Sequence, residues 1–189
     1  MQTQSETSLL TPTKQKVITL FRLLGWLGFW VELGLAIASG LALLFSISGR
    51  NFATETNAGL GVGIFWAVAG LFALLFSIFL AFRYTRIAKH LANRNSAVHP
   101  KKADTMQMLR LGAIVSLVGI FLCLLGAGAT VGVMVAKAVS QPPGVAITDP
   151  DKIIRALDVF VAVANINGIA GHFMSVVISL GLYNWLHRD

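Results

Sequence analysis

Charged side chains are scarce in this chain of 189 residues. Asp, Glu, Lys and Arg together make up 12% of the sequence, whereas an average soluble protein contains about 25%. Hydrophobic residues account for 56%, so the chain has too few polar groups to cover a soluble surface. This balance excludes an ordinary soluble globular protein.

Cysteine is almost absent, and the single Cys123 excludes an intrachain disulfide. The beginning of the chain, MQTQSETSLLTPTKQK, has no apolar segment of the kind found in a cleavable signal peptide. It is also too short and too poor in arginine for an organellar transit peptide. We therefore expect residues 1–22 to form a short disordered cytoplasmic tail of a bacterial type of chain.

Long apolar stretches are what the sequence does contain. They cover roughly residues 24–48, 58–82, 109–136 and 157–183, and the second carries no charge. Each is long enough to cross about 30 Å of hydrocarbon at about 1.5 Å per helical residue. Because the connections are short, the sequence predicts an all-α membrane protein, an antiparallel bundle of four transmembrane helices in one domain, 23–186.

The basic residues are distributed unevenly around these four stretches. Eleven Lys and Arg lie before the first, between the second and third, or after the fourth, and four lie in the other two connections. The positive-inside rule then places both termini and the central connection in the cytoplasm. The membrane is the bacterial plasma membrane or the thylakoid.

The segment 83–110 holds most of the basic residues. Clusters of Lys and Arg next to a membrane attract anionic lipid headgroups, which is the partner we expect here. A protein-docking surface is the alternative. The segment contains no recognisable nucleic-acid-binding module, so we expect no nucleic acid partner.

The last apolar stretch carries polar residues at a regular interval. Asp158, Asn165, His172 and Ser179 follow one another every seven residues, which places them along one stripe of a helix. Asn167 adds a further amide. An unpaired polar group in hydrocarbon costs several kcal/mol, so the stripe must face protein or water.

Two ionisable groups, Glu32 and His172 of the stripe, are predicted to lie deep in the membrane. Glu32 lies roughly 12 Å and His172 roughly 16 Å from the cytoplasmic boundary, so the two share a depth. We hypothesise that they meet and contact a metal ion in transit, because Glu and His offer donors suited to Fe²⁺. A buried hydrogen bond that only joins two helices is the alternative.

The outer ends of the third and fourth stretches carry opposite charges. Lys137 and Asp158 are predicted to form an interfacial ion pair worth about 1 kcal/mol or less. Nearby, Asp149-Pro150-Asp151 is typical of a helix start and predicts that the last helix begins near residue 150. No closely spaced ligands, activated nucleophile or cofactor motif is present, so we expect neither an enzyme nor a resident cofactor.

Several segments resemble a known family. LGFW at 27–30, ATVGVMVAKA at 129–138, ALDVF at 156–160 and Asn167 with His172-Phe173 are similar to the cyanobacterial and chloroplast family DUF3611. The resemblance runs from about 16 to 186 and implies four membrane helices. The plant members lie in the chloroplast inner envelope, and the resemblance implies iron transport, protein import, or both.

Two functions follow from these observations. In the first, the protein is a permease involved in iron transport, and the polar stripe lines a path used by a homo-oligomer. In the second, it is a translocon-type or assembly scaffold subunit, and the stripe binds helices to each other or to partner membrane proteins.

The distribution of basic residues generates the first testable prediction. In intact cells, a membrane-impermeant thiol reagent is expected to label a cysteine placed at Gly144 and to miss one placed at Ser96. Labelling of the Ser96 position alone would mean that the chain has the opposite orientation.

Overall fold

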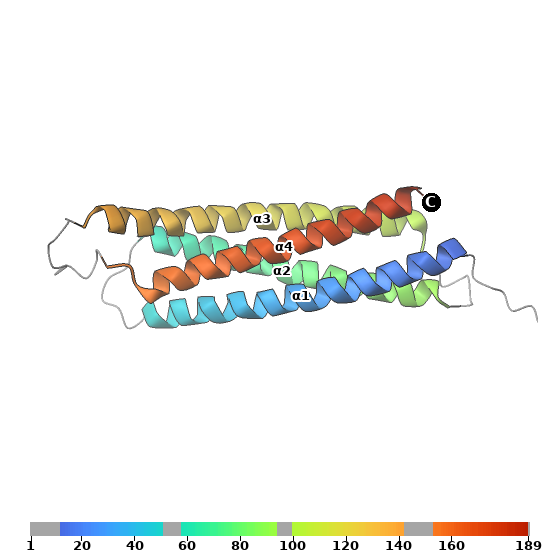
Figure 1. The fold of residues 1–189 in the computed structure, drawn as a ribbon, viewed down its shortest axis with the longest axis horizontal. Coiled ribbons are helices and arrows are strands. Elements are labelled where there is room, and N and C mark those ends of the chain that lie inside the picture. The colour runs from blue at the N-terminus through green and yellow to red at the C-terminus, as the bar shows by residue number, and fades with distance from the viewer. Residues whose placement is uncertain (1–11, 51–57, 94–99, 142–152, 189) are drawn as a thin grey trace, which may run out of the picture.

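A computed structural model describes residues 12–50, 58–93, 100–141 and 153–188. It contains four helices, α1 (Pro12–Arg50), α2 (Ala58–Leu91), α3 (Lys102–Val139) and α4 (Ala156–Arg188). They run alternately up and down along one long axis (Figure 1). Each helix contains a segment long and apolar enough to cross a membrane. The predicted class, an all-α bundle of four transmembrane helices, is confirmed.

The helices are longer than the apolar stretches that predicted them. α1 begins at Pro12, so residues 12–22 are helical and were wrongly assigned to a disordered tail. α2 continues to Leu91, well past the apolar stretch. Hydropathy marks only the part of a helix in hydrocarbon, whereas a helix satisfies its backbone in the headgroup region equally well. The probe positions Ser96 and Gly144 lie outside the described residues.

The start of α4 differs from the prediction for a local reason. Residues 153–155 are not helical, and the helix begins at Ala156 rather than near 150. The Asp158 carboxylate accepts a hydrogen bond from the backbone N–H of Arg155 at 3.0 Å. This is the reach-back half of a capping box, in which an acid in the first turn satisfies the N–H that precedes the helix. The motif Asp149-Pro150-Asp151 lies outside the described residues.

The four helices form a ring in chain order. α1 packs against α2 and α4, and α3 packs against the same two helices on the opposite side. α2 and α4 also meet across the centre, whereas α1 and α3 barely touch. α1 and α4 are therefore neighbours, as the antiparallel bundle requires (Figure 1).

Large apolar side chains lie on the outside of the bundle. Phe72 is 68% exposed, Phe65 64% and Trp30 61%. In water this arrangement would be unfavourable, but in lipid the tails solvate such side chains as well as a protein core does. The apolar exterior marks the bundle as a multi-pass membrane protein.

Small side chains fill the interior, and α3 shows the pattern most clearly. Buried residues recur every three or four positions from Thr105 to Thr130, namely Thr105, Leu109, Gly112 (with Ala113), Ser116, Gly119, Cys123, Gly126 and Thr130, and Lys137 follows seven positions later. This is the heptad spacing of helices that wind around one another in a left-handed sense. The glycines among them let neighbouring side chains lie directly on the α3 backbone.

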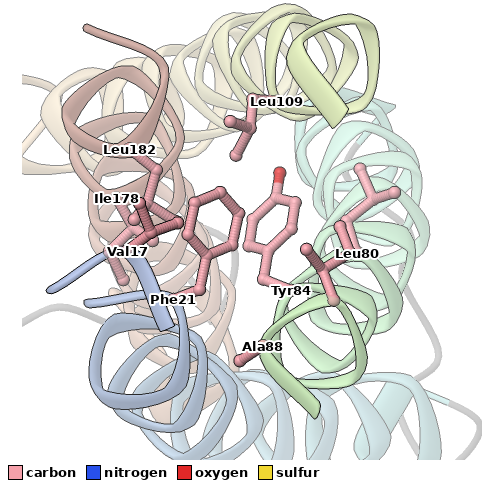
Figure 2. Close-up of a cluster of buried hydrophobic side chains, with 9 residues drawn as sticks. Val17, Phe21, Leu80, Tyr84, Ala88, Leu109, Ile178 and Leu182 are labelled. Atoms are coloured by element: carbon pink, nitrogen blue, oxygen red, sulfur yellow. The ribbon is translucent and has the colours of Figure 1, made fainter. Parts of the chain in front are cut away.

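One end of the interior is closed by large apolar side chains. Phe21, Leu109, Leu182 and Tyr84 come from the four different helices and meet there, with exposed fractions of 2% or less. Figure 2 shows these rings and aliphatic chains converging on the bundle axis. This is the end where α1 and α3 begin and α2 and α4 finish (Figure 1). We call these four side chains the apolar plug. The ring of Tyr84 belongs to the plug, whereas its hydroxyl bonds to Ser179.

The glycine contacts generate a stability prediction. A Cβ at Gly119 would overlap the imidazole of His172, whereas a Cβ at Gly128 would meet nothing within 4 Å. We expect Gly119→Ala to lower the free energy of unfolding by about 1–3 kcal/mol, the usual effect of overpacking. Gly128→Ala is the matched control and should be neutral or slightly stabilising, since alanine favours helix. Thermal unfolding in mild detergent measures both, and equal midpoints would contradict the packing described.

Candidate functional site

The polar stripe of α4 faces the interior of the bundle. Asp158 is 1% exposed, and Asn165, His172 and Ser179 are fully buried. Asn167 does not belong to the stripe, because it is only half-buried and lies on another side of the helix. Its inclusion among the stripe residues was wrong, since two residues of helix rotate a side chain by about 200°.

The other three helices turn similar residues toward this stripe. On each of them a series of buried polar side chains recurs every seven positions: Glu32, Ser39 and Ser46 on α1, Ser77 and Tyr84 on α2, and Ser116, Cys123, Thr130 and Lys137 on α3. We call these nine residues and the four of the α4 stripe the polar seam. Apart from Glu32, Cys123 and Lys137, the nine were not predicted. Reading the same interval along every helix would have found them.

Most polar groups of the seam have partners on neighbouring helices or one turn away. Ser39 donates a hydrogen bond to the Ala164 carbonyl at 3.0 Å, and Ser46 donates to the Leu157 carbonyl at 3.3 Å. Three further contacts have the same function: Ser77 with Ser116 (3.1 Å), Tyr84 with Ser179 (3.0 Å), and Thr130 with the Gly126 carbonyl (2.8 Å). These bonds satisfy groups that would be costly to bury alone.

Three buried side-chain atoms in the described residues have no hydrogen-bond partner. They are Oε2 of Glu32, Oδ1 of Asn165 and Nδ1 of His172. All three belong to the polar seam and lie between its two ends. A buried polar atom without a partner costs about 1–3 kcal/mol, so each of them is a candidate contact for a bound polar species.

The surroundings of His172 define its protonation pattern. Its Nε2 lies 3.1 Å from the carbonyl oxygen of Gly70 on α2. A carbonyl only accepts hydrogen bonds, so in the neutral ring Nε2 carries the proton and Nδ1 presents a lone pair. Gly119 of α3 makes room for the ring, since a Cβ there would overlap it. The imidazole is thus fixed by two glycines and offers one free nitrogen acceptor.

Glu32 is only 1% exposed and lies among α4 and α2 side chains. Ser175 of α4 is its hydrogen-bonding side-chain neighbour, and Tyr84 of α2 lies within electrostatic range. Gly28, one turn earlier in α1, keeps the space beside the carboxyl clear: a Cβ there would lie 3.4 Å from Oε1. One carboxyl oxygen, Oε2, is left free.

The predicted meeting of Glu32 and His172 is not found. The imidazole bonds to Gly70, while the carboxyl faces Ser175, three residues or about 4.5 Å further along α4. The two side chains contact different turns of α4, and His172 points across the bundle to α2 instead of sideways to α1. No group of three or more His, Cys, Asp or Glu side chains within the described ranges is gathered for a metal ion.

Asn165 and Cys123 occupy the level next to His172. Asn165 Nδ2 donates to the Val161 carbonyl at 2.9 Å, and its free Oδ1 faces Gly126 of α3. Cys123 Sγ packs against Gly70 and lies 2.6 Å from the position of a Cβ on Gly168. The thiol therefore fills the space between α2 and α4.

An ion pair lies at the end opposite the apolar plug. Lys137 Nζ is 2.7 Å from Asp158 Oδ2, and the side chains are 9% and 2% exposed. The pair is therefore buried. The contribution to stability of about 1 kcal/mol or less that was predicted for an interfacial pair does not apply to it. Each charge also lies at a favourable helix end, the cation near the C-terminus of α3 and the anion at the N-terminus of α4.

These features define a class: multi-pass membrane proteins whose four-helix bundle encloses a polar seam closed at both ends. The chain belongs to the DUF3611 family, described as a protein of unknown function, whose family model matches residues 11–187. This confirms the resemblance noted in the sequence. Among curated proteins it is similar to Protein TIC 21, chloroplastic, of Arabidopsis thaliana, with 33% identity over 174 residues.

That match covers 89% of this chain and 57% of the plant protein, so the chain spans little more than half the length of this relative. No solved structure matches the chain.

The buried ion pair generates a prediction that tests whether Lys137 stabilises the protein by pairing with Asp158. Lys137→Met leaves the Asp158 carboxylate buried and unpaired, so we expect it to lower the free energy of unfolding by about 3–5 kcal/mol. Adding Asp158→Asn should recover most of this loss, because no charge is then buried and the amide oxygen can still accept from Arg155. Denaturant or thermal unfolding in detergent checks this. A double variant that loses the sum of the two single losses would show that the charges are not coupled.

Proposed function

We propose that this chain is a permease for a small metal cation, with ferrous iron as its cargo. His172 and Glu32 would contact the ion in transit. The observation that carries the proposal is the free Nδ1 of His172, a fully buried lone pair whose ring is held by a hydrogen bond from the other nitrogen. Histidines that bind metals have this arrangement, since the second N–H of the ring donates to a carbonyl or carboxylate.

The other free atoms support a path instead of a storage site. Glu32 Oε2 and Asn165 Oδ1 are oxygen donors, which together with imidazole nitrogen suit Fe²⁺. They lie at different levels of the seam and are not gathered around one point. A cation would therefore exchange ligands from one level to the next, and weak binding at each level permits release.

Passage requires that both ends of the seam open. The apolar plug closes one end, and the Lys137–Asp158 pair closes the other. At the centre, Cys123 lies directly against Gly70 and Gly168, so the bundle in this state is occluded. We accordingly expect a homo-oligomer, or a complex with partner membrane proteins, in which helices can separate. We also propose that both termini lie in the cytoplasm, which the distribution of basic residues favours.

The second candidate is a translocon-type or assembly scaffold subunit without transport of its own. The observation in its favour is the close packing of the same central residues, since Gly119 and Gly126 lie against His172 and Asn165. In that case the seam fixes the register of the helices, and the apolar exterior binds partner membrane proteins. We propose no enzymatic activity under either function.

The permease proposal predicts a defined effect of two conservative substitutions. Glu32→Gln and His172→Asn are expected to reduce Fe²⁺ uptake into liposomes that contain the purified protein at least about tenfold, because each removes a metal donor of the seam. Uptake is measured with an iron-sensitive dye inside the vesicles. Ser77→Ala is the matched control, a buried seam residue whose hydroxyl is partnered by Ser116, and should leave uptake nearly unchanged.

The scaffold function gives the opposite pattern. If the seam only joins helices, liposomes that contain the wild-type protein take up no more iron than empty liposomes. Glu32→Gln and His172→Asn then change the unfolding midpoint or the oligomeric mass of the protein. Wild-type uptake that both variants retain in full would contradict the assigned roles of Glu32 and His172.

A further inference from the structure

A groove of about 1060 Å³ lies outside the polar seam, between the C-terminal end of α2 and the N-terminal end of α3. It is at the same end of the bundle as the apolar plug (Figure 1). The basic segment 83–110 contributes part of its lining, and none of the residues with free buried atoms lines it. The transport proposal therefore does not account for it.

The lining of the groove changes from apolar to charged along its length. Phe76 and Phe79 of α2 and Leu111 of α3 line the part nearer the middle of the bundle. One to two turns further along α2, Arg83 and Arg86 line the part nearer the helix ends. A ligand that fits this lining has an apolar tail and an anionic head.

The two arginines are available for an anion. Both side chains are exposed, and each guanidinium lies over a phenylalanine of its own helix, at 5.9 Å for Arg83 and 5.0 Å for Arg86. Neither forms an ion pair among the residues that the structure describes, where Lys137–Asp158 is the pair present. The stacking holds the guanidinium groups beside the groove without neutralising them.

We infer that this groove is a binding site for one anionic phospholipid. Its phosphate would be bound by Arg83 and Arg86, and an acyl chain would lie along Phe76, Phe79 and Leu111. Arginine binds phosphate through paired N–H groups, and each basic residue near a membrane surface contributes about 1 kcal/mol of attraction to anionic lipid. The preference for anionic over zwitterionic headgroups follows from the local charge, since two guanidinium groups and one carboxylate, that of Asp104, line the groove.

The exposure of the apolar part favours a lipid over a soluble anion. Phe76 is 42%, Phe79 52% and Leu111 45% exposed on the outside of a membrane-spanning bundle. A free phosphate would use only the arginines and leave these side chains without a function. A lipid uses both parts at once and stays within the bilayer.

The test compares lipid retention by the full-length protein in detergent. Native mass spectrometry with added phosphatidylglycerol should show one tightly retained lipid, and phosphatidylcholine or inorganic phosphate should be retained at least about tenfold less. Arg83→Gln with Arg86→Gln should reduce phosphatidylglycerol retention by about the same factor. Lys89→Gln with Lys102→Gln, an equal charge change at exposed positions outside the groove, should retain it.

A second variant tests the apolar part of the groove, where the acyl chain would lie, separately from the two arginines. Leu111→Trp fills the apolar part of the groove while keeping both arginines, and it should also reduce retention. Equal retention of phosphatidylcholine, equal loss in the lysine control, or full retention by Leu111→Trp would each overturn the assignment. Because the readout is lipid binding, these outcomes are independent of whether the protein transports iron.

Discussion

The close approach of helix backbones at glycine is the contact on which the rest of the structure depends. Gly70 shows why: its carbonyl accepts the His172 ring, and its Cα faces the thiol of Cys123. Gly119 and Gly126 make the equivalent space on α3. Lipid supplies no hydrophobic drive between helices, so only such close packing and internal hydrogen bonds favour association. With larger residues at these positions, the polar side chains of α4 could not be enclosed.

Much of this arrangement could be predicted from the sequence because it depends on local patterns. Hydropathy gave four spans, and the interval of seven residues from Asp158 to Ser179 gave the buried face of α4. Hydropathy and the seven-residue interval each depend on a single helix in lipid, because polar side chains must face the bundle interior whichever residues they contact there. The positions of Lys137 and Asp158 at adjoining helix ends likewise follow from span length and antiparallel order alone.

The partners inside the bundle could not be predicted in the same way. Depth along the axis placed Glu32 and His172 at one level, but it contains no information on the direction in which a side chain points. The approach of α2 to α4 across the bundle decides that direction, and it arises from where the glycines of all four helices fall. The helix ends were missed for a different reason. Hydropathy reports the hydrocarbon boundary, whereas the start of α4 is set by the bond from the Arg155 N–H to Asp158.

The distribution of satisfied and free polar atoms separates two roles within the seam. Toward its ends, Tyr84 bonds with Ser179, and Lys137 pairs with Asp158. Between them, Glu32, Asn165 and His172 each keep one atom without a partner. If the seam served only to hold helices together, selection for stability would favour a partner for every buried atom or an apolar residue in its place. Free ligand atoms confined to the middle of an otherwise satisfied seam are consistent with the permease proposal, because the ligands of a passing cation must be available before it arrives.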